Sequence, residues 1–280
     1  ANISFEIIFV DDGSVDNSLT IIKELSKRDQ RVRYASFSRN FGHEAASTCG
    51  FHMAKGSAAV LIDADLQDPP SLIPEMYQKW KEGYEVVYAR RISRDGETFL
   101  KKLTSHLFYR LINIFSKVKI PVDVGDFRLV DRRVIDTFNR LTEHSRFVRG
   151  LFAWVGYKQT SVDYKRLPRK SGKTKYNWTR LVLLSMDAIF GFSLVPLRLC
   201  IIFGIITIIF SFINIGSIVF QRLFLDLDIP GYALLTAGMF LLGGIQLTFL
   251  GVIGEYIGKI YIEAQGRPLY IVREKSDYEA

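Results

Sequence analysis

A short acidic stretch carries the most specific chemical signal in the sequence. Asp63, Asp65 and Asp68, together with the amide of Gln67, fall within six residues directly after the apolar run Ala58–Ile62. Neighbouring carboxylates repel one another unless a cation holds them. Mg²⁺ and Mn²⁺ favour oxygen ligands, and they commonly act by bridging phosphates. The stretch therefore predicts a divalent metal beside a phosphorylated ligand; solvated loop carboxylates are the alternative.

A second acidic turn occurs near the start of the chain. Asp11 and Asp12 directly follow the apolar and β-branched run Ser4–Val10 and precede Gly13 and Ser14. A helix N-cap is the ordinary explanation for such a turn. In open α/β sheets, however, ligands bind beyond the carboxyl ends of the strands. Two acidic strand ends in one domain therefore also indicate a shared ligand site.

The elements that would position these residues alternate between strand and helix. Strand patterns cover Ser4–Val10, Arg31–Phe37, Ala58–Ile62 and Glu85–Tyr88, and helical patterns cover residues 14–29, 44–55, 70–82, 98–116 and 132–141. Alternation with short connections is typical of a parallel sheet that helices cover on both faces. We therefore expect an α/β fold with a mostly parallel sheet.

The C-terminal part of the chain has a different character. Residues 199–220 and 231–254 form runs of 22 and 24 residues without a formal charge. A helix needs about 20 apolar residues to cross a bilayer, so both runs predict transmembrane helices joined as a hairpin. Their basic flanks favour the cytoplasmic side, which predicts a multi-pass protein of the cell's inner (plasma) membrane. Two buried helices of a soluble core are the alternative.

A basic stretch and an amphipathic pattern precede the first run. Trp178 to Phe192 place apolar residues roughly on one helical face, and the stretch from Lys165 to Lys175 is rich in Lys and Arg. This combination predicts a helix lying in the interface of an anionic membrane, with an ordinary core helix as the alternative. The pattern GxxxxGK[ST] is not completed, because Leu167 stands where its first glycine belongs. We therefore expect metal and basic side chains to hold phosphates.

Five segments together resemble a known family: VDDGSVDNS (10–18), SRNFGHEAA (38–46), DADLQDPP (63–70), VGDFRLVDR (124–132) and RKSGKTKY (169–176). They resemble family-2 glycosyltransferases of the polyprenyl-phosphate sugar synthase group, above all the bacterial bactoprenol glucosyltransferases, and also dolichyl-phosphate mannose synthase. The resemblance implies a GT-A (Rossmann-like) fold and transfer of a sugar from a nucleotide-sugar to polyprenyl phosphate, with inversion. It covers essentially the whole chain.

The resemblance also implies a division of the chain. We expect a cytoplasmic catalytic domain over residues 1–165, a basic loop with an interfacial helix over 166–196, the transmembrane hairpin over 197–254 and a cytoplasmic tail over 255–280. Members of the family normally begin with a strand that contacts the nucleotide. This sequence opens at Ala1, already on what would be the following strand, so that first family strand is expected to be missing from it.

The same resemblance implies roles for individual residues. Nucleotide-sugar binding falls to Asp11, Asp12 and Asp63, metal binding to Asp65 and Gln67, the role of candidate base to Asp126, and phosphate or acceptor binding to Arg128, Arg169, Lys173 and Lys175. A salt bridge of Asp126 with Arg128 or Arg132 is the alternative for the candidate base. An anionic-lipid patch is the alternative for the last three cations.

Several alternatives for the function stay open at this point. UDP-glucose and undecaprenyl phosphate are the expected substrates, with GDP-mannose or a UDP-linked formyl-aminoarabinose as other donors, and glycines near 243–254 favour a homo-oligomer. A non-catalytic membrane anchor or scaffold is the alternative from another class. The two cysteines exclude a disulfide framework, and the acidic cluster argues against nucleic-acid binding despite the formal charge of +8.

Overall fold

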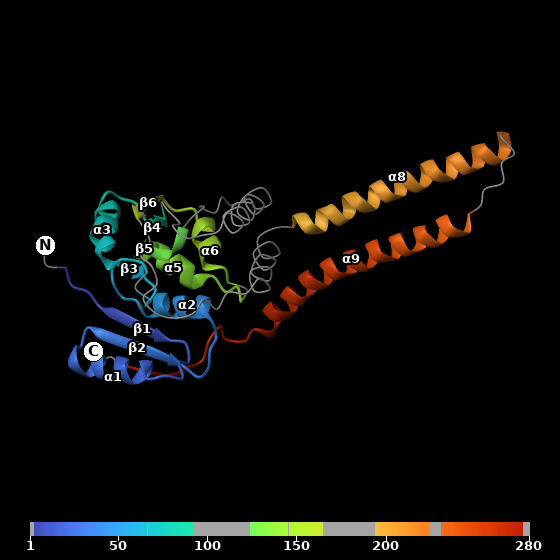
Figure 1. Ribbon diagram of the computed structural model, residues 1–280. Helices are drawn as coiled ribbons and strands as arrows, with labels where there is room; N and C mark the ends of the chain where they lie inside the picture. Colours follow the sequence, from blue (N-terminus) through green and yellow to red (C-terminus); the bar gives the residue numbers. More distant parts are fainter. Residues whose placement is uncertain are drawn as a thin grey trace.

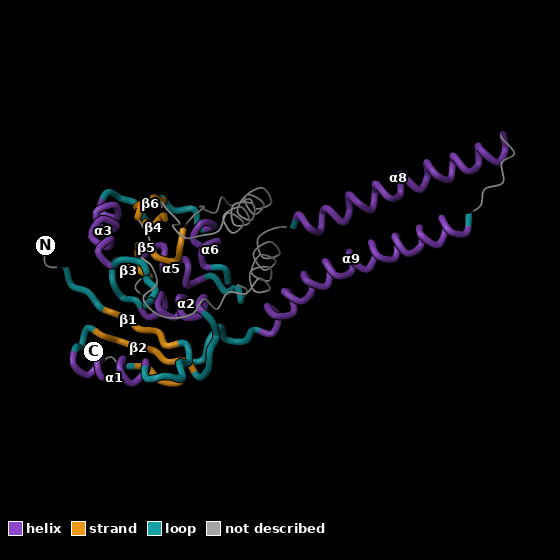
Figure 2. The backbone as a smooth tube through the Cα atoms, viewed as in Figure 1, coloured by secondary structure: helices purple, strands orange, loops and turns teal. Residues whose placement is uncertain are grey.

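The computed structural model describes residues 3–65, 67–91, 124–144, 146–164, 194–224 and 231–276. The predicted helices at 98–116 and 178–192 lie outside these residues, as do Arg169, Lys173 and Lys175. The described chain forms an α/β part, from which two long helices extend side by side (Figure 1). Most strands of the α/β part lie between helices (Figure 2).

The strands form two sheets. The first has the order β1-β2-β7 and the second the order β3-β5-β4-β6. Their bounds are β1 Ile7–Asp11, β2 Val32–Phe37, β3 Ala58–Leu61, β4 Val86–Arg91, β5 Val124–Asp131, β6 Gln159–Tyr164 and β7 Val272–Lys275. All four strands expected from the apolar runs are therefore present.

The expectation of a mostly parallel sheet is wrong for the described residues. β1 pairs with β2 and β4 with β6 in parallel, but β5 runs antiparallel to both β3 and β4, and β7 runs antiparallel to β2. The strand–helix alternation in the sequence covers β1 to β4 only. β5, which that pattern does not include, lies between β3 and β4 in the sheet. β7 comes from the C-terminal end of the chain and forms an edge strand of the first sheet.

The helices of the α/β part are short and follow the strands. They comprise α1 Ser18–Arg28, α2 His43–Met53, the 3₁₀ turn η1 Pro70–Leu72, α3 Ile73–Lys81, α5 Arg132–Arg140 and α6 Val148–Trp154. Apolar side chains pack on both faces of the second sheet. One group includes Phe138 and Phe152, whose rings stack at 4.8 Å, and the other gathers around Met76 of α3. These cores fix the strand ends that carry the acidic residues.

The two apolar runs lie in long helices, α8 Val195–Phe224 and α9 Tyr232–Gln265. Val195–Asn214 and Leu241–Gln265 are each long and apolar enough to cross a membrane, and neither stretch is buried inside the protein. α9 continues beyond the uncharged run and ends only at Gly266. Side chains such as Phe212 and Leu247 are about 70% exposed, as expected for helices whose environment is not protein.

Candidate active site

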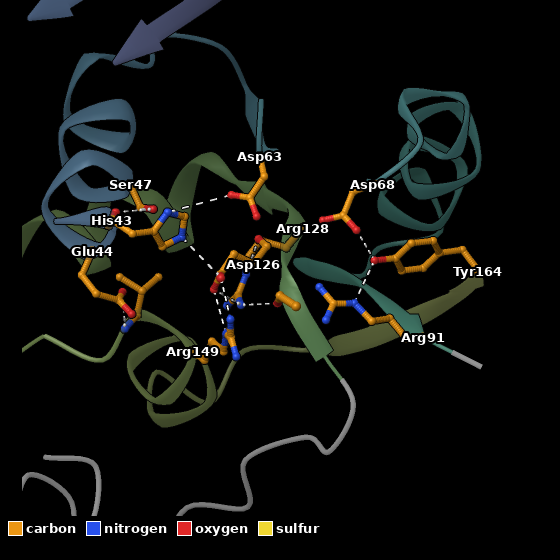
Figure 3. A network of polar contacts seen from close by, with 12 residues as sticks. His43, Glu44, Ser47, Asp63, Asp68, Arg91, Asp126, Arg128, Arg149 and Tyr164 are labelled. Carbon is orange, nitrogen blue, oxygen red and sulfur yellow. Dashed lines mark hydrogen bonds and ion pairs between the residues drawn. The ribbon is translucent and has the colours of Figure 1, made fainter. Parts of the chain in front are cut away.

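Asp126 lies at the centre of a network of charged side chains near the end of β3 (Figure 3). Its carboxylate accepts two hydrogen bonds from Arg149 of α6, at 2.8 Å from Nε and 2.6 Å from Nη2. Nε2 of His43 lies 3.3 Å from the same carboxylate, and Arg128 lies 3.9 Å from it. Arg132 pairs instead with Asp136. Three cations thus surround one carboxylate that is 7% exposed.

The surroundings decide the ionisation of this network. Burial tends to raise the pKa of Asp126, but hydrogen bonds from Arg149 and His43 and the nearby guanidinium charges outweigh it and lower the pKa well below its usual range. In return, the hydrogen bond to Asp126 raises the pKa of His43 to about 9. Asp126 is therefore a carboxylate at neutral pH, and His43 is an imidazolium.

Arg128 contributes its charge from a buried position. Its guanidinium donates to the backbone oxygens of Asp126, at 3.1 Å, and of Gly125, at 3.0 Å, and lies 5.0 Å from the ring centroid of Phe152. Burial lowers the pKa of Arg128 to about 10. The side chain predicted to bind phosphate thus turns back onto its own strand, where it holds the backbone around Asp126. A small hollow lined by Tyr88, Arg128, Arg149, Phe152 and Gln159, among others, adjoins it.

His43 is a site residue that the sequence did not single out. It is the first residue of α2, and its ring lies between the carboxylates of Asp126 and Asp63, with Nδ1 3.9 Å from Asp63. The side chain is 48% exposed, so the ring is open to a ligand. The signal in the sequence was a histidine directly after a glycine at a helix start. That glycine, Gly42, has φ of +99°, a conformation that favours glycine.

The first acidic turn builds the start of this helix. Asp12 accepts hydrogen bonds from the backbone N–H groups of Phe41, at 2.6 Å, and Gly42, at 2.9 Å. Asp11 is buried and accepts from the N–H of Ser14 and from the hydroxyl of Ser36 on the neighbouring strand. Both carboxylates therefore tie loops together in this structure, and the role in nucleotide binding stays a prediction.

The second acidic turn faces the network. Burial raises the pKa of Asp63, and the negative charges of Asp126, Asp68 and Asp65 add to this effect while His43 opposes it. Asp65 accepts a hydrogen bond from the N–H of Gln67 at 3.1 Å. The end of β3 therefore gathers several carboxylates whose mutual repulsion a bound cation would relieve.

A divalent metal fits these residues if a phosphorylated ligand supplies the rest of its coordination shell. Among the described residues, no three His, Cys, Asp or Glu side chains converge as a group that could hold a metal ion. Mg²⁺ characteristically binds through one or two carboxylates and completes its shell with substrate phosphates and water. The half-buried residues Asp65 and Gln67, next to Asp63 in the same turn, suit that mode. The donor set thus fits a metal that arrives with a phosphorylated ligand.

Asp68, the last acid of the turn, belongs to a separate polar network beside the site (Figure 3). It is fully buried and accepts a short hydrogen bond from the hydroxyl of Tyr164, which in turn accepts from Arg91 at 3.2 Å. A Cβ at Gly125 would come within 2.7 Å of the Arg91 guanidinium. The absence of a side chain at Gly125 therefore lets the Arg91 guanidinium lie directly against the backbone of the residue that precedes Asp126.

Arg149 is the second site residue that the sequence did not single out. It is the second residue of α6, a helix that the sequence analysis also missed. Glu44 of α2 accepts a hydrogen bond from the N–H of Val148 at 3.0 Å, which fixes the start of α6 against the start of α2. Burial raises the pKa of Glu44. His43 and Arg149 are thus brought to Asp126 by two helix starts that are joined to each other.

Comparisons with known proteins agree with the resemblance in the sequence. A family model described as Glycosyl transferase family 2 matches residues 2–138. The uncharacterized glycosyltransferase YkcC of Bacillus subtilis is 51% identical over 276 residues, which are 99% of this chain and 85% of that protein. The SfII prophage-derived bactoprenol glucosyl transferase of Shigella flexneri is 40% identical over 96% of this chain and 87% of its own length. A prophage bactoprenol glucosyl transferase homolog of Escherichia coli is also 40% identical, over 96% of this chain and 88% of its own length.

Proposed function

Because the chain belongs to glycosyltransferase family 2, we propose that it transfers a hexose from a nucleotide-sugar to polyprenyl phosphate, with inversion. Relatives named bactoprenol glucosyl transferase that match nearly the whole chain support glucose as the sugar and a polyprenyl acceptor. UDP-glucose is then the donor and undecaprenyl phosphate the acceptor. Mannose from GDP-mannose and a formyl-aminoarabinose from its UDP form are the alternatives within the same reaction.

One observation carries this proposal. The half-exposed His43 lies between Asp63 at the end of β3 and Asp126 of β5, and Arg149 and Arg128 complete the group. Positive and negative side chains thus alternate across a site next to a candidate metal position. Both substrates are anionic, so their phosphates need such positive charges in order to approach each other. A scaffold protein would need no such arrangement, which argues against the non-catalytic alternative.

The proposed reaction exchanges one bond at the anomeric carbon. An oxygen of the acceptor phosphate forms a bond to that carbon, and the bond from the carbon to the nucleoside diphosphate breaks. Family-2 enzymes commonly use a divalent metal, which when bound offsets the charge on the departing diphosphate. We assign Asp65 and Gln67 to that metal and Asp63 to the ribose or diphosphate.

Asp126 needs little basicity for this chemistry. A phosphate monoester has a second pKa of about 6, so the acceptor is largely a dianion at neutral pH. The lowered pKa of Asp126 and its hydrogen bonds to Arg149 favour an orienting role: the carboxylate holds Arg149 and His43 where the two anions meet. Binding of the acceptor phosphate by Arg169, Lys173 and Lys175 stays part of the proposal.

The C-terminal strand supports the proposed membrane topology. β7 follows α9 in the chain but pairs with β2, which precedes α8. Two segments of one sheet lie on the same side of a membrane, so α8 and α9 would cross it as a hairpin. The positive-inside rule places that side in the cytoplasm, where nucleotide-sugars are made available to the site. We accordingly propose a plasma-membrane enzyme with a cytoplasmic catalytic part.

A donor panel tests the proposed function. Membranes that contain the full chain are incubated with radiolabelled UDP-glucose, GDP-mannose or UDP-formyl-aminoarabinose and polyprenyl phosphate, and the label in the organic phase is measured. We expect transfer from UDP-glucose, and transfer that is lower by about 10²-fold in membranes that carry the Asp126→Asn variant. If label enters the organic phase from one other donor alone, the sugar of that donor replaces glucose in the proposed reaction. No label from any donor would refute the proposal.

A further inference from the structure

The end of α9 contacts the α/β part through a compact set of residues, 263–267, which we call the foot of α9. The helix ends because Gly266 adopts the left-handed conformation, with φ of +58°, and its N–H donates to the oxygen of Glu263 at 3.2 Å. Glycine takes this conformation without the penalty other residues incur. The chain therefore turns sharply after the helix, and Glu263 and Arg267 come to the same side.

His144 binds the foot through three groups. The carboxylate of Glu263 accepts from the backbone N–H of His144 at 2.7 Å and lies 3.1 Å from Nδ1 of its ring. The other ring nitrogen contacts the backbone oxygen of Arg267. A carboxylate and a carbonyl can only accept, so these contacts favour the form of His144 in which both ring nitrogens donate, and they raise its pKa. One residue thus receives the end of a helix that is long and apolar enough to cross a membrane.

Arg149 follows His144 by five residues in the sequence. Hydrogen bonds hold two residues between them, Arg146 and Val148. Arg146 donates to the backbone oxygens of Leu141 and Glu143 and to the hydroxyl of Thr48 in α2. Its guanidinium lies 5.1 Å from the ring centroid of Phe138. The N–H of Val148 donates to Glu44. These contacts hold Arg146 and Val148, and with them the start of α6, against α2 and the loop before His144.

The foot is also held on its other side. Tyr270, four residues after Gly266, stacks on Phe37 of β2 with ring centroids 4.8 Å apart, and its hydroxyl lies 2.8 Å from Nδ1 of His52. β7 then pairs with β2. The chain at the foot is consequently held both by the first sheet and by His144, five residues before Arg149.

We propose that Glu263 is a positioning residue for the transfer reaction: through His144 it sets Arg149 against Asp126, and it couples the seat of α9 to the arrangement of the active site. This inference rests on the proposed function and deepens it. The contact acts on the side of the site formed by α6, away from the acidic turn of β3. Loss of the contact should therefore lower turnover and leave donor binding nearly unchanged.

The test uses the full chain in mild detergent with the variants Glu263→Ala and Glu263→Gln. Glu274→Gln is the matched control, because Glu274 lies on the same tail and forms a similarly exposed ion pair with Lys23 at 2.7 Å. We expect kcat to fall about fivefold in Glu263→Ala, a factor that corresponds to the upper end of the energy of an exposed ion pair, with KM for the donor within about twofold. Glu263→Gln keeps an acceptor for His144 and should recover part of the rate.

Hydrogen exchange of the Val148–Trp154 amides supplies a readout that does not depend on activity. It should speed up in Glu263→Ala and stay unchanged in Glu274→Gln. Wild-type turnover or unchanged α6 exchange in Glu263→Ala would overturn the inference, as would an equal loss in the control. If the wild-type protein transfers no sugar at all, the proposed function fails, while the exchange measurement still decides whether the foot positions α6.

Discussion

Replacing Asp126 by Asn tests whether this carboxylate is the counter-charge that holds the active site together. In the folded protein it faces Arg149, His43 and Arg128. Asn keeps the size of the side chain and one acceptor oxygen, but it removes the negative charge. The three cations would then repel one another without the carboxylate that lies between them. We therefore expect Asp126→Asn to lower both transfer and stability.

The size of the stability loss follows from the exposure of the partners. Removing one partner of a buried ion pair costs about 3–5 kcal/mol, because the remaining charge is left without compensation. Arg128 is 3% exposed, but Arg149 is 32% exposed and can turn toward water. We expect the free energy of unfolding to fall by about 2–3 kcal/mol, below the full cost for that reason. Transfer should fall by about 10²-fold, as for loss of a positioned charged group.

The assay combines denaturant unfolding in mild detergent with turnover and with donor affinity by calorimetry. Asp136→Asn is the matched control, since its pair with Arg132 is at the surface and should contribute at most about 0.5 kcal/mol. The double variant Asp126→Asn, Arg149→Gln should be less destabilised than the sum of the single variants. Additive losses, or normal turnover in Asp126→Asn, would refute the assigned role.

Three further predictions concern the metal, the pH dependence and the membrane. Chelation with EDTA should abolish transfer and Mg²⁺ or Mn²⁺ should restore it, and Asp65→Asn should raise the metal concentration needed for half-maximal rate; full turnover in EDTA would count against the site. The pKa of His43 is raised from 6.5 to about 9, so the stabilisation by its pair with Asp126 is complete below about pH 6.5 and is lost as the pH rises through 9; unfolding experiments should show this decline in the wild type and a smaller one in His43→Gln. The protein should stay in the membrane through a carbonate wash, with a C-terminal reporter active in the cytoplasm; a reporter active only outside would contradict the hairpin.

The sequence predicted those elements whose burial is visible as an apolar run. β1 to β4 and both long helices follow such runs, and their positions agree with the structure to within a few residues, apart from the longer α9. β5 was missed because Gly125, Asp126 and Arg128 interrupt its apolar pattern, although all three are buried. The charge of Asp126 is compensated by His43 and Arg149, which come from other elements. A pattern along the chain does not reveal such compensation.

The candidate site was predicted in part for a related reason. The carboxylates at the strand ends stand out locally, and Asp63 and Asp126 do lie on either side of one ring. His43 and Arg149 are 83 and 23 residues away from Asp126 in the sequence, and only the packing of two helix starts brings them there. A buried carboxylate requires positive partners, so the sequence indicated that cations were needed but not which ones.

The two acidic turns, one at Asp11 and Asp12 and the other from Asp63 to Asp68, contribute to the site in different ways. Asp12 directs both carboxylate oxygens to backbone N–H groups that open α2, and thereby places His43 and Glu44. Glu44 in turn fixes Val148 and hence Arg149. The turn after β3 instead faces the ring of His43 with Asp63. In this structure the first turn arranges the cations in advance, and preorganised charges of this kind lower a barrier because they need no rearrangement during the reaction.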